Sequence, residues 1–328
     1  MTPSSLLFTL TLFMGTLISL SSTNWLYLWT GMELNLLSFI PLIASSHRMQ
    51  ETEAGVKYFI VQAMGSGLML TAGIMATNSS SVESFHFFIP MIFFTSMILK
   101  LGAAPCHQWL PHVMSSISWG HCLILATWQK VSPLIMVTFI MPRNFYFMIF
   151  IIAGLSAIVG GLGGLNQSQM RPLLAYSSIG HMGWILSTIQ CSSNLFLVYF
   201  MTYIVISFGV ISLLMKNNIT MNKVSNSMTS MNSFLFMMIM LTLFSLGGLP
   251  PFLGFIPKWL IIADLASKQM LVLVSLLITG SLINLFYYFN ITFNFILSNP
   301  QTLSRNNMSI YPILITLMCT VTSFIILL

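Results

Sequence analysis

Several charged side chains lie where a membrane would keep them from water. Glu33, Lys100, Lys130 and Lys258 each fall within a long run of apolar residues, and Lys130 is deep inside its run. A charged side chain at the centre of a bilayer costs about 3 kcal/mol or more. Because the chain meets this cost repeatedly, we expect these charges to have a function.

Their chemistry is that of proton transfer. Removing an ammonium group from water lowers its pKa, and a nearby carboxylate raises it again, so a lysine whose partner comes and goes binds and releases a proton. Glu33 is the one acidic residue well inside an apolar run of the first half, so we expect it to pair with Lys100. Lys130 and Lys258 would continue the row, with water and His181 bridging the gaps.

Each of these residues also has a structural interpretation. Glu33 fits a stray carboxylate at the membrane interface, and Lys100 fits a side chain that extends along its helix to the surface. Lys258 fits a cation that caps a turn, and His181 fits a hydrogen-bonded packing residue. The structural interpretation is weakest for Lys130, because neither membrane face is near it.

The composition is that of an integral membrane protein. Of 328 residues, 56% are hydrophobic and 5% are charged, whereas a soluble domain is about a quarter charged. Runs of about 20 apolar residues indicate helices rather than a barrel. The net charge of +6 indicates membrane topology rather than nucleic-acid binding, since no basic cluster is interleaved with aromatic residues. The four cysteines show no disulfide or metal-binding spacing.

Eleven apolar runs predict an all-α polytopic protein with about eleven transmembrane helices. The runs span 5–21, 25–45, 57–77, 84–104, 115–141, 145–165, 172–191, 194–215, 232–268, 270–297 and 309–328. Basic residues favour the side from which insertion occurs. Most of them lie in connections on the N-terminal side, which we therefore expect to be matrix or cytoplasm, with the C-terminus opposite.

Glycine and proline interrupt the fourth and ninth runs. The fourth is expected to break at 102–105 and again at Pro111, and the ninth over 247–258. These two runs stand five apart, and since five is odd, a five-helix repeat would be inverted in the membrane. Interrupted helices at equivalent places in two inverted halves are typical of ion transporters.

The predicted domain organisation follows from this repeat. Residues 1–144 would form the first five-helix repeat, residues 145–300 the inverted second repeat, and residues 301–328 an extra C-terminal helix.

Other motifs favour structural roles. The spacing of His107, His112 and His121 fits no common zinc site. The glycines of 160–164 follow no strand, which predicts small-residue helix packing rather than nucleotide binding.

The remaining acidic residues are expected at the surface or as local partners. Glu51, Glu53 and Glu83 fall in predicted connections and are expected to be solvated. Asp264 is either a local partner of Lys258 or an anchor at a helix end.

Five segments together resemble the antiporter-like membrane subunits of respiratory complex I, the mitochondrial NADH–ubiquinone oxidoreductase. They are WTGMELNLLSFIPL, LKLGAAPCHQWLP, WQKVSPL, GGLNQSQMRPLLAYSSIGHMGW and SLGGLPPFLGFIPKW, in collinear order. The resemblance implies two inverted five-helix repeats with discontinuous fourth helices. It also implies that Glu33, Lys100, Lys130 and Lys258 form the charged axis of paired proton half-channels, with His181 in a lesser connecting role. Cys106 and His112 depart from the family pattern, which leaves the role of His112 open.

The resemblance implies proton translocation coupled to electron transfer from NADH to ubiquinone elsewhere in the complex. The chain would bind no NADH, FMN, iron–sulfur cluster, ubiquinone or metal. Its partners would be other membrane-arm subunits, including the other antiporter-like chains, and lipid, but not nucleic acid. It would lie in the mitochondrial inner membrane, with the N-terminus in the matrix and the C-terminus in the intermembrane space.

Two other functions remain open on the sequence alone. A stand-alone cation/proton antiporter would share the repeat and the broken helices and would need no partner. A structural subunit would use its buried charges only to fix helix registry.

Overall fold

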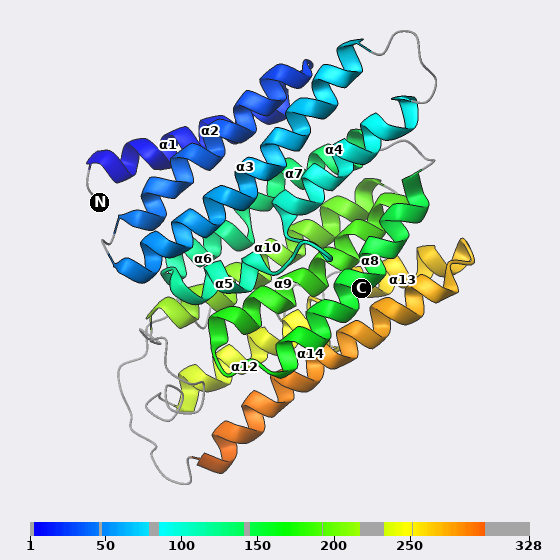
Figure 1. The fold of residues 1–328 in the computed structure, drawn as a ribbon. Coiled ribbons are helices and arrows are strands. Elements are labelled where there is room, and N and C mark those ends of the chain that lie inside the picture. Colours follow the sequence, from blue (N-terminus) through cyan, green and yellow to red (C-terminus); the bar gives the residue numbers. More distant parts are fainter. Residues whose placement is uncertain are drawn as a thin grey trace. The chain divides into compact units, whose positions relative to one another are not determined.

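The computed structural model describes residues 3–45, 48–78, 85–140, 145–191, 193–216, 233–250 and 252–298. This part of the chain is built from helices and their connections (Figure 1). Its internal contacts divide it into two compact units, Met1–Met148 and Ile149–Leu328, and each is described by itself.

Six of the described helices are long and apolar enough to cross a membrane. They are Pro3–Ser21, Trp25–Ala44, Met49–Thr77, Tyr146–Leu165, Asn194–Met215 and Leu271–Phe293. Two shorter apolar helices, Phe88–Leu101 and Phe236–Gly247, are the first parts of the interrupted runs. The protein is therefore an all-helical, multi-pass membrane protein. The last expected run, 309–328, lies outside the described residues.

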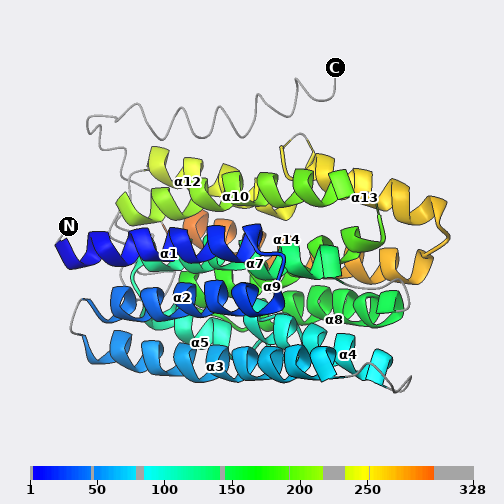
Figure 2. The ribbon, with the colours of Figure 1, turned by 90° about the horizontal axis from the view of Figure 1, so that it is seen from above.

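Unit 1 begins with three long helices that pack in sequence (Figures 1 and 2). They are α1 (Pro3–Ser21), α2 (Trp25–Ala44) and α3 (Met49–Asn78). α1 and α2 approach closely, because a Cβ on Gly31 would lie only 2.5 Å from the Ser19 backbone nitrogen. Small residues permit such contacts between membrane helices.

α3 starts eight residues before the predicted apolar run, at Met49 rather than Lys57. The polar segment before the run forms the first turns of the helix, and Glu51 lies in its first turn, where a negative charge is favourable. The apolar run therefore marks the part of the helix suited to lipid and not the whole helix.

Unit 1 continues with four shorter helices. They are α4 (Phe85–Leu101), α5 (Trp109–Ser116), α6 (Trp119–Ala126) and α7 (Trp128–Ile140). α4 ends at the expected break. Gly102 has a φ of 68°, in the left-handed region that glycine adopts without strain, and its N–H bonds to the Ile98 carbonyl at 3.0 Å.

Two expectations about this region are wrong. Pro111 does not break a helix: it lies in the first turn of α5, where its missing N–H has no intrahelical partner to lose. The fifth run is not continuous, because Thr127 separates α6 from α7. The Thr127 hydroxyl donates to the Leu123 carbonyl at 2.7 Å, a local bond that competes with regular helix geometry.

Unit 2 holds the remaining helices, apart from the first three residues of α8. They are α8 (Tyr146–Leu165), α9 (Met170–Ser187), the short 3-10 helix η2 (Thr188–Gln190), α10 (Ser193–Lys216), α12 (Ser233–Gly247), α13 (Phe255–Ser267) and α14 (Leu271–Ser298). α9 lies in the interior and contacts α10, α13 and α14. The ninth run breaks as predicted, between α12 and α13.

The glycine-rich segment of α8 serves close helix packing, as predicted. A Cβ on Gly160 would lie 2.4 Å from the Gly180 nitrogen of α9, and one on Gly164 would lie 2.6 Å from the ring of Tyr287 on α14. α8 can therefore contact both helices at short range.

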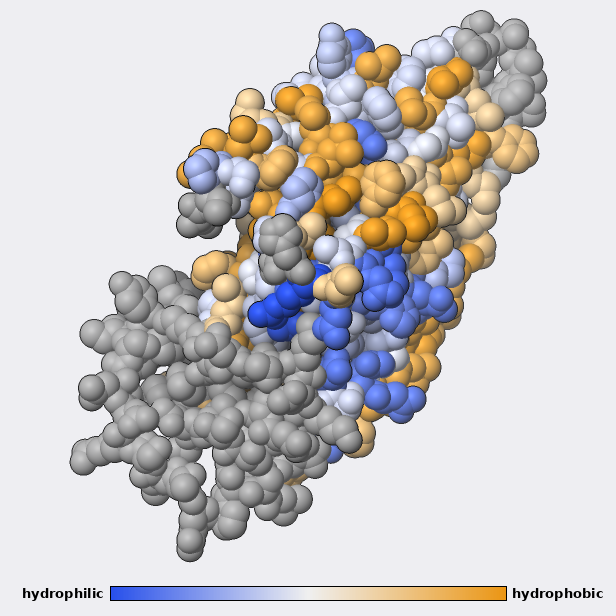
Figure 3. Space-filling view, turned by 60° about the vertical axis from the view of Figure 1, so that its left-hand side comes forward, coloured by the Kyte–Doolittle hydropathy of each residue, from blue (hydrophilic) through white to orange (hydrophobic). Residues whose placement is uncertain are grey.

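Large apolar side chains remain exposed on the outer helices. Figure 3 shows a broad band of hydrophobic side chains on one face, with hydrophilic ones beside it. Leu10 and Leu17 of α1 and Ile60 and Met64 of α3 are each at least half exposed. Such a surface suits lipid or a partner subunit rather than water.

Candidate functional site: buried lysines and their polar neighbours

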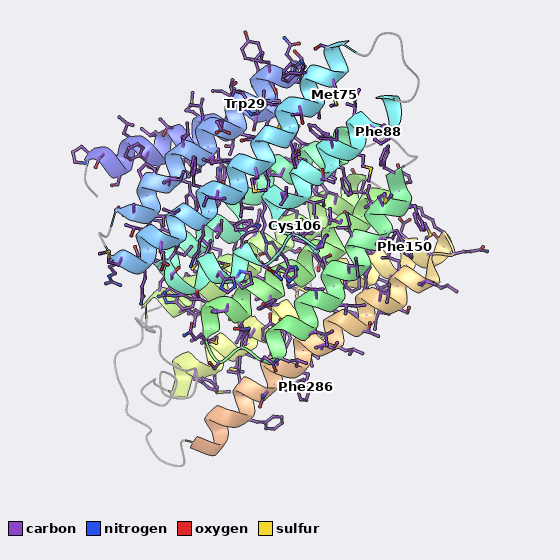
Figure 4. The ribbon with its side chains drawn as sticks, in the orientation of Figure 1. Trp29, Met75, Phe88, Cys106, Phe150 and Phe286 are labelled. Atoms are coloured by element: carbon purple, nitrogen blue, oxygen red, sulfur yellow. The ribbon has the colours of Figure 1, made fainter. Side chains whose placement is uncertain are left out.

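Lys100 lies in the last turn of α4, immediately before the break. It is buried, its ammonium lies 3.5 Å from the Met32 sulfur of α2, and its backbone carbonyl accepts a bond of 3.2 Å from the Gln62 amide of α3. Figure 4 shows Cys106 in the connection that follows the break. Since the break interrupts the helix at this point, the lysine is placed beside polar backbone within the bundle.

Glu33 of α2 approaches Lys100 without forming an ion pair. Its carboxylate acts electrostatically on Lys100 and on Tyr58. Its Oε2 atom is buried and has no hydrogen-bond partner among the described residues. Both ion pairs found in the described part, Lys57–Glu53 and Lys268–Asp264, lie elsewhere. The structure thus brings the two predicted residues near each other but leaves them unbonded.

Lys130 of α7 is the most completely buried of the three lysines, at 2% exposure. Its neighbour in sequence, Gln129, joins two other helices: its amide donates to Asn35 Oδ1 of α2 at 2.9 Å, and its carbonyl accepts from the Tyr58 hydroxyl of α3 at 3.3 Å. Hydrogen bonds between uncharged polar groups therefore link α2, α3 and α7 at the residue that precedes Lys130.

Asn35, Tyr58 and Gln129 were not predicted as site residues. A signal was present in two of them, because Asn35 follows Glu33 by two positions and Gln129 precedes Lys130. Tyr58 gave no such signal, since a tyrosine in an apolar run is ordinary.

Lys258 of α13 reaches back across the break to the end of α12. Its ammonium donates to the Gly247 carbonyl at 2.7 Å and the Leu246 carbonyl at 3.4 Å, and lies 5.8 Å from the centre of the Trp184 ring. A cation is favourable at a helix C-terminus. The capping interpretation of Lys258 therefore describes its contacts in this structure.

His181 of α9 is also buried and is bonded through Nδ1 to the Tyr199 hydroxyl of α10 at 2.9 Å. The Tyr203 ring lies 5.2 Å from the imidazole. Tyr199 stacks on Trp184, the residue over which Lys258 lies. A series of contacts thus connects His181 to Lys258 within unit 2.

The two helix breaks have the same backbone geometry. After α4, the N–H groups of Gly102 and Ala103 both bond to Ile98 O, at 3.0 and 3.3 Å. After α12, those of Gly248 and Leu249 both bond to Phe244 O, at 3.0 and 3.3 Å. Gly248 also has a positive φ, of 81°. Each unit therefore ends one apolar helix with a glycine-dependent turn beside a buried lysine.

The structure corrects the expected setting of Glu51 and decides between the two interpretations of Asp264. Glu51, expected in a solvated connection, is only 2% exposed and acts electrostatically on His121. Asp264 bonds Lys268 at 2.9 Å, one helical turn onward in sequence, so its partner is not Lys258. Glu53 is exposed, in an ion pair with Lys57, and Glu83 lies outside the described residues.

The histidines of unit 1 bond locally. His121 Nδ1 lies 2.9 Å from the Ser118 hydroxyl, and His107 Nδ1 lies 3.1 Å from the Pro105 carbonyl. In the ranges that the structure describes, no three His, Cys, Asp or Glu side chains are grouped to hold a metal ion.

The site residues fall in two groups. Glu33, Lys100 and Lys130 lie in unit 1, and His181 and Lys258 lie in unit 2. Buried amines beside neutral hydroxyl, amide and carbonyl groups can take up and release protons without a permanent counter-ion. The continuation of the row from Lys130 to Lys258 remains a prediction.

Comparison with known proteins places the chain in a family. Residues 22–284 match the family described as NADH:quinone oxidoreductase/Mrp antiporter, TM. The NADH-ubiquinone oxidoreductase chain 2 of Lumbricus terrestris is 43% identical over 283 residues, which cover 86% of this chain and 83% of that protein. The corresponding chain 2 of Anopheles gambiae is 40% identical over 304 residues, 91% of this chain and 87% of that one.

A solved structure shares the fold at lower identity. A chain of respiratory complex I from Thermus thermophilus superposes with a TM-score of 0.82 and 20% identity, over 98% of this chain and 77% of that one. Since this identity is low, the likeness supports the fold alone. The sequence matches carry the assignment: the chain belongs to the NADH:quinone oxidoreductase/Mrp antiporter transmembrane family, among the chain 2 proteins of NADH-ubiquinone oxidoreductase.

Proposed function

We propose that this chain translocates protons in the membrane arm of respiratory complex I through Glu33, Lys100, Lys130 and Lys258, with His181 as a secondary connection. The family supplies the general function, a proton-translocating, antiporter-like subunit of NADH:ubiquinone oxidoreductase. The observation that supports the residue assignment is the burial of all three lysines inside the helix bundle. Lysines that served only as surface anchors would extend to water.

The proposed mechanism uses an unbonded carboxylate. A conformational or electrostatic signal from electron transfer elsewhere in the complex would change the distance between Glu33 and Lys100. A carboxylate that moves nearer favours the charged ammonium, and one that moves away favours release of the proton. Lys130 and then Lys258 would receive the proton in turn.

The wider arrangement is part of the same proposal. The chain would have about eleven transmembrane helices, with residues 1–144 and 145–300 as inverted repeats and 301–328 as an extra helix. The matching turns after α4 and α12 support such a repeat. The chain would lie in the mitochondrial inner membrane with its N-terminus in the matrix and its C-terminus in the intermembrane space.

Its partners would be the other membrane-arm subunits, including the other antiporter-like chains. NADH, FMN, iron–sulfur clusters and ubiquinone would be bound by other chains of the complex.

The test compares Lys130→Met with Lys57→Met in the assembled complex. Methionine keeps the apolar stem of lysine but has no exchangeable proton. Lys57 is an exposed lysine of α3 paired with Glu53, so Lys57→Met removes a positive charge and leaves the buried Lys130 ammonium in place. We expect Lys130→Met to lower the number of protons pumped per NADH oxidised in sealed vesicles, and Lys57→Met to leave it unchanged. Full proton stoichiometry in an assembled Lys130→Met complex would overturn the residue assignment.

A further inference from the structure

The ammonium of Lys100 rests on a sulfur atom rather than on a carboxylate. Its Nζ atom donates to the Met32 sulfur of α2 at 3.5 Å, and the two residues are buried, at 7% and 5% exposure. In the part of the chain that the structure describes, this sulfur is the one hydrogen-bond partner of the ammonium. A thioether is an uncharged and weak acceptor. The ammonium is therefore held less tightly than it would be by a charged group.

Helix α3 directs the lysine side chain towards α2. A Cβ on Gly65 of α3 would lie 3.1 Å from the Lys100 Cγ atom and 3.5 Å from its Cε atom, so the α3 backbone lies directly against the lysine stem. The Gln62 amide, one turn earlier on α3, donates to the Lys100 carbonyl at 3.2 Å. Because α3 occupies this side of the lysine, the ammonium extends to Met32.

The carbonyl groups at the end of α4 are bonded to neutral donors. The Leu99 carbonyl accepts from the Trp109 ring nitrogen at 3.2 Å, and the Lys100 carbonyl accepts from the glutamine amide of α3. Unit 2 differs, because the Lys258 ammonium bonds the Gly247 carbonyl at the end of α12. The two lysines therefore rest on different acceptors, a helix end in unit 2 and a thioether in unit 1.

The thioether turns the ammonium away from Glu33. Met32 and Glu33 are neighbours in α2, so their side chains point in directions about 100° apart. The ion pairs found among the described residues do not include Lys100 with Glu33, although the carboxylate acts electrostatically on the lysine. The position of the sulfur thus accounts for two opposite charges that are close and unbonded.

Few other titratable groups face this lysine. The buried or half-buried ones on α2 and on the helices that pack against α4 are Glu33 of α2, Glu51 and Tyr58 of α3, and Lys130 of α7. Of these, Glu33 is the one that acts on Lys100. A change in the contact between these two residues should therefore decide at which pH Lys100 releases its proton.

We propose that Met32 is a positioning residue for Lys100: its thioether keeps the ammonium off Glu33 in the resting state, but too weakly to prevent pairing when the carboxylate moves. The inference rests on the proposed function, in which the distance between Glu33 and Lys100 changes. Without the sulfur, the ammonium would turn to the carboxylate that already acts on it. The two would then form a lasting ion pair.

Three variants of the assembled complex test this role. Met32→Leu removes the acceptor and keeps a side chain of similar volume, an exchange that protein cores tolerate well. Met32→Gln restores an uncharged acceptor, the amide oxygen. Met64→Leu is the matched control, because it makes the same exchange at a residue of α3 that is 60% exposed.

The first measurement is a density map of each resting complex. In Met32→Leu we expect the Lys100 ammonium within about 4 Å of a Glu33 carboxylate oxygen, the distance of an ion pair. In Met32→Gln and Met64→Leu the ammonium should stay on residue 32 and off the carboxylate. An unpaired Lys100 in Met32→Leu would overturn the inference.

The second measurement is the pH profile of pumping in sealed vesicles, with the pumping rate divided by the rate of NADH oxidation at each pH. A carboxylate beside an ammonium favours the protonated form, so in Met32→Leu the proton should leave Lys100 at a higher pH. The acidic limb of the profile should move up by about one pH unit. Met32→Gln and Met64→Leu should keep the native profile. An equal loss of pumping at every pH, not restored by Met32→Gln, would show a merely structural role and contradict the proposal.

The outcomes separate this inference from the proposed function. Full proton stoichiometry in Lys130→Met would overturn the lysine assignment, whereas the density maps would still decide whether Met32 keeps Lys100 and Glu33 apart. Impaired pumping in Lys130→Met, with native behaviour of Met32→Leu in both measurements, would overturn the role of Met32 alone. If Met32→Leu fails to assemble, Met32→Ile, which also lacks an acceptor, provides both measurements.

Discussion

At the scale of single residues, charge is what made the site visible in the sequence. Lys100, Lys130 and Lys258 stood out because a lysine in an apolar run is costly, and the structure buries all three. Gln129 was marked only by its place next to Lys130, and Tyr58 was not marked at all, because neutral polar residues occur throughout such runs. Their role depends on contacts among three helices, which no single segment of the sequence reveals.

Glu51 is a charged residue whose burial the sequence did not predict. Its surroundings in the sequence are polar, which favours a solvated position, yet the fold covers it. Whether a helix end is covered depends on elements distant in the sequence, and α3 packs against α5, which begins some thirty residues after α3 ends.

One residue-scale prediction concerns Gly248. Alanine would have to adopt the left-handed φ of 81°, and its Cβ would lie 2.8 Å from the Lys258 ammonium. We expect Gly248→Ala to destabilise the folded chain by about 1–2 kcal/mol from backbone strain alone, and to displace Lys258 from the Gly247 carbonyl. The measurement is the temperature at which the solubilised complex loses this subunit.

Gly67→Ala provides the control for that substitution. Gly67 lies inside α3 with no atom within 4 Å of a Cβ, so alanine should leave stability unchanged or raise it by about 0.5–1 kcal/mol. Equal stability of the two variants would show that the turn after α12 tolerates a side chain.

At the scale of elements, glycine and proline predicted the breaks after α4 and α12 but not every interruption. Pro41, Pro90 and Pro133 lie inside helices, and Pro111 lies in the first turn of one, so proline alone does not locate a break. The interruption at Thr127 has neither residue type next to it. Thr127 bonds its own helix backbone there, but many threonines inside helices make the same bond, so no sign of this interruption is visible in the sequence.

The element-scale prediction tests the contact between α8 and α9. A Cβ on Gly160 would lie 2.4 Å from the backbone nitrogen of Gly180, and backbone cannot move aside as a flexible side chain can. Gly160→Ala should therefore separate the helices at a cost on the order of 1–3 kcal/mol. Less assembled complex should appear on a native gel.

Gly55→Ala is the matched control, because its Cβ would meet only the Ile43 side chain, at 3.8 Å. Assembly of Gly160→Ala at the level of this control would contradict the close packing.

At the scale of the whole molecule, the apolar surface indicates a chain that works within lipid and among partners. Exposed leucine, isoleucine and methionine side chains on α1 and α3 exceed what a soluble surface carries. The composition predicted membrane residence, and the five motifs predicted the family, whereas the mutual contacts of buried polar groups required the structure.

The whole-molecule prediction separates a complex I subunit from a stand-alone antiporter. In mild detergent the chain should migrate on a native gel with NADH dehydrogenase activity. The purified chain, reconstituted alone into liposomes, should not exchange cations for protons. Rapid exchange by the isolated chain, with no co-migration, would favour the antiporter function.

The bond between Lys258 and the end of α12 has a mechanical consequence. A hydrogen bond from a charged ammonium is about twice as strong as one from a neutral amine, so loss of a proton from Lys258 would weaken its bond to the Gly247 carbonyl. Hydrogen–deuterium exchange at the Gly248 and Leu249 amides should then be faster when Lys258 is deprotonated than when it is protonated. In Lys258→Met the exchange should be fast under both conditions. The protonation state of Lys258 would then be coupled to the stability of the backbone turn after α12, so that proton transfer and movement of the helix end occur together.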